Sequence, residues 1–232
     1  MNHVLADIKE FQQELIAIRR DIHKHPETAF EEHRTSQLVA DRLTQWGLEI
    51  HRGLAKTGVV GTLVGRSPGI TIGLRADLDA LNIEEHSLRG HKSIHEGKMH
   101  ACGHDGHTAM LLGAARYFSL NRDFPGIIHF IFQPAEEGQG GGRVMIEEGL
   151  FKLFPCDMVF GMHNMPGIAA GDFAICPGPM MAASDTWTVT FSGSGGHGSM
   201  PHLATDATLA GANFITGIQS IISRNVAPSD SA

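Results

Sequence analysis

Residues 126–137, GIIHFIFQPAEE, decide the fold that this sequence predicts. The nearly continuous run of isoleucine and phenylalanine is typical of a strand that is buried on both faces of a sheet. Pro134 ends the run, and Glu136 and Glu137 follow directly before glycines, where there is no helix face for them to occupy. Carboxylates at the end of a buried strand indicate an open α/β sheet with a ligand site at its carboxyl edge.

Two further strands are predicted to bring polar side chains to the same edge. Asp77 and Asp79 lie at and just after the end of the run ITIGLRAD at 70–77, and His163 ends the run DMVFGMH at 157–163. Because the carboxyl ends of such strands open into one crevice, we expect these groups to share a site with the glutamate pair.

The rest of the chain alternates between helical and strand-like patterns, as in βαβ units. Helices are expected at 5–24, 28–47, 107–120, 141–151 and 207–223, and strands at 48–54, 58–65 and 185–195. Thr28 and Glu31 have the spacing of a capping box at the start of the second helix. From about residue 180 the rhythm changes, so a second, smaller domain is expected to begin there.

The composition is that of an ordinary globular protein. The 232 residues carry a formal charge of −7 and no basic stripe, which argues against nucleic acid as a partner. The N-terminal segment is charged throughout, and no apolar run approaches the ~20 residues that cross a bilayer. We therefore expect no membrane association and a cytoplasmic location. Cys156 and Cys176 are expected to be small buried hydrophobic residues.

Residues 98–107, KMHACGHDGH, place three histidines, a cysteine and an aspartate in a loop that can reach the same sheet edge. Cys102 and His104 could join Glu137 and His163 in a set of thiolate, imidazole and carboxylate ligands. Such a set suits zinc, manganese or cobalt rather than calcium or magnesium.

Other interpretations of this loop stay open. His100 and His107, each taken alone, are expected to be surface residues or to support the ligands. Cys102 could instead be a nucleophile that a neighbouring histidine activates, as in a cysteine amidase.

The adjacent glutamates predict a division of roles. In an extended chain, neighbouring side chains face opposite sides, so one glutamate can bind metal while the other faces the substrate. A free carboxylate beside a metal-activated water is the usual arrangement for general-base hydrolysis. The sequence therefore predicts a metal-dependent hydrolase.

Six motifs in order along the chain resemble one family of metal-dependent amidohydrolases. They are RRDIHKHPE, GLRADLDAL, MHACGHDGH, FQPAEEGQGGG, FGMHNMPG and SGSGGHGSMPH. The family is typified by hippurate hydrolase, N-acyl-amino-acid deacylase and the plant auxin-conjugate hydrolases, and is related to aminoacylase and carboxypeptidase. The resemblance implies hydrolysis of the amide bond of N-acyl or N-aroyl amino acids.

The resemblance also implies an architecture. It implies an α/β fold, with a mixed α/β/α sandwich of the zinc-exopeptidase type at 1–180 that forms the N-terminal part of a catalytic domain. The start of a smaller α+β dimerisation or lid domain would follow at 181–232. A complete site would hold two divalent metal ions, which could be zinc, manganese, cobalt or nickel, and the complete protein would be a homodimer acting on a small molecule.

Roles for individual residues follow from the same resemblance. It implies four metal ligands, which are Cys102, His104, Glu137 and His163. It further implies that Glu136 is the general base, that Asp77 supports the ligands, and that His197 reaches into the active site from the smaller domain.

The chain departs from the family in its length. Members are usually longer, because the chain returns from the smaller domain to complete the catalytic domain and to supply one more metal-binding histidine. This sequence ends one strand and one helix into that insertion, and Asn82 stands where the family usually has proline. The alternative function is therefore a catalytically inactive fragment that keeps a partial metal site and a dimerisation surface.

Overall fold

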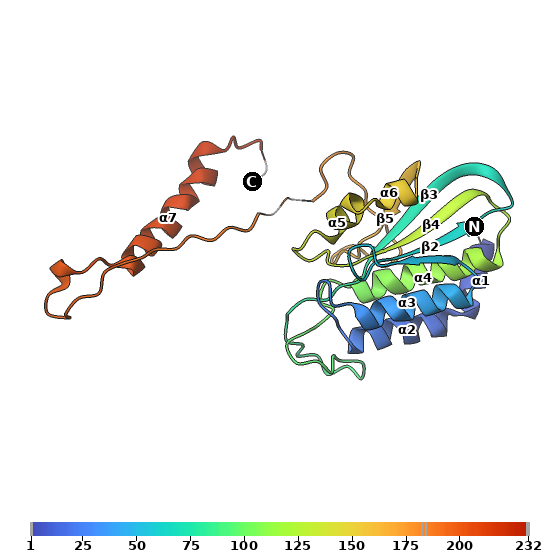
Figure 1. Cartoon of the computed structure of the whole chain (residues 1–232), viewed down its shortest axis with the longest axis horizontal. Helices are drawn as coiled ribbons and strands as arrows, with labels where there is room; N and C mark the ends of the chain where they lie inside the picture. The colour runs from blue at the N-terminus through green and yellow to red at the C-terminus, as the bar shows by residue number, and fades with distance from the viewer. Residues whose placement is uncertain (1, 182, 184, 231–232) are drawn as a thin grey trace. The chain divides into compact units, whose positions relative to one another are not determined.

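A computed structural model describes residues 2–181, 183 and 185–230 of the chain. The chain forms two compact units, Met1–Pro166 and Gly167–Ala232 (Figure 1). No helix in the described ranges is long and apolar enough to cross a membrane.

A mixed five-stranded sheet organises the first unit. Its order is β1-β2-β4-β3-β5, and the strands are β1 (Glu49–Arg52), β2 (Val59–Val64), β3 (Ser67–Asp77), β4 (Pro125–Gln133) and β5 (Met158–Gly161). The first three strands in this order pair antiparallel, whereas β3 runs parallel to both β4 and β5. The parallel part contains the three strands that the sequence predicts to carry the site.

Helices cover both faces of this sheet (Figure 1). On one face lie α1 (Asn2–Glu10), α2 (Gln12–Lys24), α3 (His33–Gln45) and α4 (His104–Leu120), and on the other lie α5 (Gly141–Glu147) and α6 (Leu150–Leu153). The arrangement confirms the expected mixed α/β/α sandwich.

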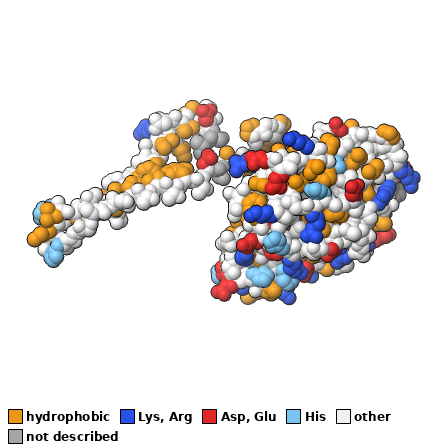
Figure 2. All heavy atoms as spheres, in the orientation of Figure 1, with side chains coloured by type: hydrophobic (Ala, Val, Ile, Leu, Met, Phe, Trp, Pro, Cys, Tyr) orange, Lys and Arg blue, Asp and Glu red, His pale blue; other side chains and the backbone are white. Residues whose placement is uncertain are grey.

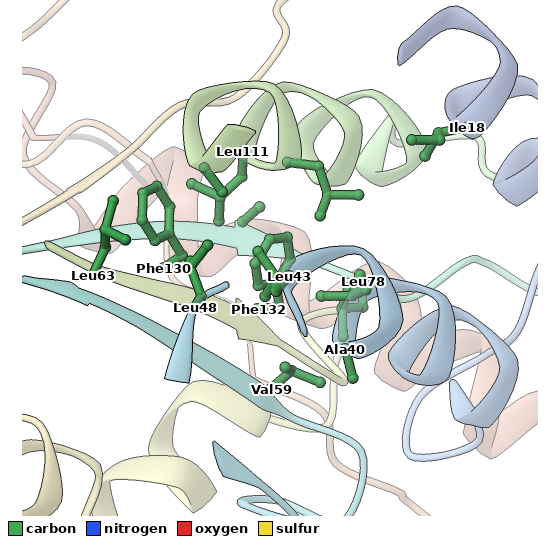
Figure 3. Packing of buried hydrophobic residues seen from close by; sticks show 14 of the residues in the cluster. Ile18, Ala40, Leu43, Leu48, Val59, Leu63, Leu78, Leu111, Phe130 and Phe132 are labelled. Atoms are coloured by element: carbon green, nitrogen blue, oxygen red, sulfur yellow. The ribbon is translucent and has the colours of Figure 1, made fainter. Parts of the chain in front are cut away.

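Strand β4 shows why both faces must be covered. Its Phe130 and Phe132 are fully buried in the core beneath α2, α3 and α4 (Figure 3), whereas Ile131 packs in a second core with Met145 and Leu150. Alternate side chains of a strand point to opposite faces, so an apolar run of this kind needs apolar partners on each side.

Two of the expected helices have different boundaries. The single helix expected at 5–24 is divided into α1 and α2 by Phe11, which is buried and lies beneath the guanidinium group of Arg116. The helix expected from Thr28 begins only at His33, because Phe30 has a left-handed φ of 62° that a helix does not allow. The hydroxyl of Thr28 donates to the Glu31 carboxylate, and the backbone N–H of Glu31 donates to the carbonyl oxygen of Thr28. Neither side chain accepts from the backbone N–H of the other residue, so the predicted capping box is wrong.

Two other segments also differ from expectation. The helix expected at 141–151 is broken at Gly149, whose φ of 100° ends α5 and begins α6. Cys176 is exposed and Cys156 is partly exposed, so neither is the fully buried hydrophobic residue that was predicted.

The second unit is built around α7 (Ala207–Asn225), which begins where Asp206 accepts a hydrogen bond from the backbone N–H of Leu209 at 2.9 Å. A short 3₁₀ helix, η1 (Pro201–Leu203), precedes it. The segment 185–195 is extended but has no strand partner within the described residues, so the strand predicted there is not formed. Trp187 and Phe191 of this segment contact Phe214, and apolar side chains remain visible along this unit (Figure 2).

Candidate metal centre

The carboxyl ends of the parallel strands bring the predicted site residues together. Asp77 is level with Gln133 in the β3–β4 pair, so the glutamates after β4 emerge beside the aspartates after β3. Arg75 is level with Gly161 in the β3–β5 pair, which puts His163 at the same edge. The loop before α4 supplies the remaining groups.

His104 is the common member of this site. Its ligand nitrogen lies within 4.8 Å of ligand atoms in three groups of side chains, which are Cys102 with His163, Asp77 with His107, and Glu136 with Glu137. The Sγ of Cys102 lies 3.2 Å from Nε2 of His163. The other three residues expected as metal ligands, Cys102, Glu137 and His163, therefore lie around the buried imidazole of His104.

Both glutamates approach this imidazole. Oε2 of Glu136 and Oε1 of Glu137 lie 3.9 and 3.8 Å from Nε2 of His104. The extended chain that would turn adjacent glutamates to opposite sides is not found here. Glu137 lies in a turn closed by a 2.8 Å hydrogen bond from the backbone N–H of Gly138 to the carbonyl oxygen of Glu136, and the preceding Ala135 has a left-handed φ of 51°. The two still differ in accessibility, since the Glu136 side chain is 42% exposed and the Glu137 side chain 23%.

Gly103 allows two neighbouring ligands to face one centre. It is the residue before α4 and has a φ of 94°, which reverses the chain between Cys102 and His104. A Cβ atom at this position would lie 2.2 Å from Oδ1 of Asn164. Glycine is therefore required both by the backbone conformation and by the lack of space. Helix α4 also begins three residues earlier than expected, so His104 is held on its first turn.

The donor atoms fit a transition metal ion. Nε2 of His104 and Oε1 of Glu137 are buried and have no hydrogen-bond partner among the described residues. A buried polar atom without a partner costs free energy, which a bound cation would recover. Burial and the nearby Glu137 carboxylate raise the pKa of Cys102 to about 12, so the thiol is protonated unless a cation replaces the proton.

Asp77 and His107 form a tight pair beside this centre. Oδ1 of Asp77 lies 2.6 Å from Nδ1 of His107, and Nε2 of His107 accepts a hydrogen bond from the backbone N–H of Asn164 at 3.0 Å. Burial alone would raise the pKa of Asp77, but the hydrogen bond from His107 and the charge of Arg75 outweigh it and lower the pKa to about 2.

Asp79 lies at this edge of the sheet, as its place just after the run 70–77 predicts, but the sequence indicated no role for it. One of its oxygens lies 3.3 Å from Nδ1 of His104, and the other accepts a hydrogen bond from the backbone N–H of Glu137 at 2.9 Å. It thus contacts two of the expected ligands. The available signal was its position two residues beyond Asp77, at the same strand end.

The other histidines of the loop are not on the surface. His100 and His107 are 3% and 2% exposed, so the surface interpretation is wrong for both. Burial lowers the pKa of His100 to about 4, and neither of its ring nitrogens has a hydrogen-bond partner among the described residues. His197 belongs to the second unit, where it is exposed and its Nδ1 lies 2.7 Å from Oγ of Ser199.

The mixed sheet with helices on both faces, and a cluster of thiol, imidazole and carboxylate groups at its carboxyl edge, define an α/β protein with a candidate metal centre. A family model for Peptidase family M20/M25/M40 matches residues 73–225. The chain belongs to this family.

Relatives of the chain are named as hydrolases. It is 46% identical over 230 residues to a hippurate hydrolase of Campylobacter jejuni, covering 99% of this chain and 60% of that protein. It is 45% identical over 224 residues to an N-acyl-L-amino acid amidohydrolase of Geobacillus stearothermophilus, covering 95% of this chain and 60% of that protein. The chain thus spans three fifths of the length of these relatives.

A solved structure supports the fold. The YXEP protein of Bacillus subtilis, a dinuclear metal binding peptidase of the M20 family, superposes with a TM-score of 0.65 at 42% identity. The similarity covers 68% of this chain and 45% of that one.

Proposed function

We propose that this chain is part of a metal-dependent amidohydrolase that cleaves the amide bond of N-acyl or N-aroyl amino acids, with hippurate as a representative substrate. The observation that carries the proposal is the convergence of Cys102, Glu137 and His163 on the buried His104. The names of the relatives support the substrate class.

The metal would be held by the four expected ligands, Cys102, His104, Glu137 and His163. Their mixed sulfur, nitrogen and oxygen donors favour zinc, manganese, cobalt or nickel over calcium or magnesium. The similarity to a dinuclear metal binding peptidase supports two ions in a complete site. When bound, such an ion supplies a Lewis acid that polarises the amide carbonyl and lowers the pKa of a coordinated water.

Glu136 is the candidate general base. Its side chain is the more exposed of the pair, so it can reach water and substrate while Glu137 holds the metal. Its carboxylate would take a proton from the attacking water and then deliver that proton to the departing amine. Asp77 and Asp79 would keep the imidazoles of His107 and His104 in fixed orientations.

We further propose that the first unit belongs to the catalytic domain and the second to the lid or dimerisation domain. The exposed His197 would act on substrate from that second domain. The boundary expected at residue 180 lies inside the second compact unit, which begins at Gly167.

The test distinguishes the proposed roles of Glu136 and Glu137 by replacing each with glutamine. We expect Glu136→Gln to retain metal but to lose ~10²–10⁴-fold in the rate of hippurate hydrolysis, because general-base help is removed. Glu137→Gln should lose metal. Glu147→Gln is the matched control, because Glu147 lies on α5 with a side chain that is 68% exposed.

Elemental analysis after dialysis measures the metal, and glycine release from hippurate measures the rate. Equal loss of activity with intact metal in both variants would contradict the assigned roles. Metal retention by the unsubstituted chain with no hydrolysis of N-acyl amino acids would favour the alternative, an inactive chain with a partial metal site.

A further inference from the structure

Four residues other than glycine have a positive φ in the described part of the chain. They are Phe30 at 62°, Ala55 at 49°, Lys56 at 68° and Ala135 at 51°. Left-handed conformations are unfavourable for residues with a Cβ atom, so the surrounding structure must hold them. The four residues belong to three segments that are far apart in the sequence.

One buried carboxylate contacts all three segments. Glu32 is 0% exposed, and its Oε1 accepts hydrogen bonds from the backbone N–H groups of Phe30 at 3.1 Å and Ala135 at 2.9 Å. Its Oε2 accepts a hydrogen bond at 2.6 Å from the hydroxyl of Thr57, which directly follows the left-handed pair Ala55 and Lys56. A buried carboxylate is tolerated only when such donors surround it.

The bond to Ala135 is next to the candidate catalytic residues. Ala135 immediately precedes Glu136 and Glu137, and its carbonyl oxygen accepts a hydrogen bond at 2.8 Å from the backbone N–H of Gly141 at the start of α5. The left-handed φ at Ala135 accompanies a turn in which both glutamates approach His104 rather than facing opposite sides. The turn after β4 is therefore fixed by Glu32 on one side and by Gly141 on the other.

We propose that Glu32 is a positioning residue that holds the turn at Ala135 and so sets the placement of Glu136 and Glu137. This proposal rests on the proposed function, which gives those glutamates their roles. Glu32 itself contacts no ligand atom of the candidate metal centre among the groups described above. Its effect passes through the backbone of Ala135.

The conservative variant is informative because the two carboxylate oxygens have different partners. In Glu32→Gln the amide oxygen can still accept both backbone N–H groups, and the amide nitrogen can donate to the hydroxyl of Thr57. Glu32→Ala removes every acceptor and leaves the partly buried N–H group of Phe30 and the buried N–H group of Ala135 without this partner.

The first measurement is amide hydrogen exchange of metal-free protein. In Glu32→Ala we expect exchange at Ala135 to be faster by at least tenfold, with Glu32→Gln close to the unsubstituted protein. Val39→Ala is the matched control: it removes fully buried volume from α3 and lowers stability without touching the turn. Unchanged exchange at Ala135 in Glu32→Ala would overturn the proposal.

The second measurement is zinc affinity by competition with a chelator. We expect Glu32→Ala to bind zinc about 10-fold more weakly, which is typical when a residue that orients metal ligands without binding the metal is lost. The zinc affinities of Glu32→Gln and Val39→Ala should stay within about twofold of the unsubstituted protein. Adding Ala135→Gly to Glu32→Ala should restore part of the affinity, because glycine adopts the left-handed conformation without help. Equal affinity losses in Glu32→Ala and Val39→Ala, with no recovery by Ala135→Gly, would mean that Glu32 is merely structural.

These outcomes are distinct from failure of the proposed function. If the unsubstituted chain binds no zinc, the metal-dependent function fails, whereas hydrogen exchange still reports whether Glu32 holds the turn. If Glu32→Ala does not fold, the proposal is tested by the amide exchange rate at Ala135 in Thr57→Val. This variant removes one of the three donors to the Glu32 carboxylate. An unchanged exchange rate at Ala135 would then contradict the proposal.

Discussion

Oδ1 of Asp79 lies 3.3 Å from Nδ1 of His104, and both side chains are fully buried. Burial alone would lower the pKa of His104, but the hydrogen bond to Asp79 and the charges of Asp77 and Asp79 outweigh it and raise the pKa. The same carboxylate accepts the backbone N–H of Glu137. One side chain thus orients an imidazole and a glutamate that come from different parts of the chain.

Asp79→Ala should therefore weaken metal binding although Asp79 is not one of the expected ligands. Loss of a group that orients metal ligands typically costs 10–100-fold in affinity, and we expect a loss in this range for zinc. Competition with a chelator measures it. Asp123→Ala is the control because the Asp123 side chain is 85% exposed. Equal zinc affinity in both variants would contradict an orienting role for Asp79.

Metal binding should stabilise the first unit. A ligand present at 100 times its dissociation constant raises the free energy of unfolding by ~2.7 kcal/mol when only the folded state binds it. We therefore expect zinc to raise the melting temperature and a chelator to reverse that increase. Cys102→Ser should reduce the shift, whereas Cys176→Ser, at an exposed thiol, should leave it unchanged. A zinc-induced shift that is the same in both variants would argue against Cys102 as a ligand.

The core beneath α4 makes a large contribution to stability. Leu112 is 0% exposed, and we expect Leu112→Ala to lower the free energy of unfolding by about 2–5 kcal/mol through lost burial and a cavity. Met110 lies on the same helix but is 46% exposed, so Met110→Ala should change stability by no more than about 0.5 kcal/mol. Urea denaturation followed by fluorescence of Trp46, in a Trp187→Phe background, measures both. Similar midpoints for the two variants would contradict the observed packing.

His129 should make the first unit less stable in mild acid. It is 5% exposed on β4, Oγ1 of Thr62 lies 2.9 Å from its Nδ1, and burial lowers its pKa. The unfolded chain takes up a proton near the ordinary pKa of ~6.5, whereas the folded protein takes it up only at lower pH. Between these two values the unfolded state binds more protons, so stability falls as the pH drops below the unfolded value.

His129→Gln should reduce this loss, since glutamine does not titrate and can still pair with Thr62. The measurement is the free energy of unfolding in urea at pH 7.5 and pH 5. His86→Gln, at an exposed histidine, is the control. The same pH dependence in His129→Gln and in the unsubstituted protein would refute the assignment to His129.

Much of the fold follows from short stretches of sequence. The apolar run in β4 and the acids after it predict a buried strand and a site at its end, because side-chain alternation and strand direction are local properties. The register places Asp77 level with Gln133, in agreement with that expectation. The assembly of Cys102 and His104 also depends on a local feature, the left-handed Gly103 between them.

Contacts between residues that are distant in the sequence determine the helix boundaries that local patterns did not predict. The break at Phe11 accompanies its contact with Arg116, and the late start of α3 accompanies the left-handed Phe30 whose N–H binds Glu32. No local pattern reveals such partners, since helix propensity is a weak preference that tertiary packing overrides.

The sequence by itself determined the βαβ order, the strand ends that carry the acids, and the residue types of a metal centre. Only the tertiary structure decided that both glutamates turn toward His104, because that turn depends on a left-handed residue held by a carboxylate 103 positions away. It likewise assigned Asp79, whose partners lie 25 and 58 positions along the chain. A sequence pattern records which groups are available, whereas burial and long-range hydrogen bonds select the one backbone conformation in which they meet.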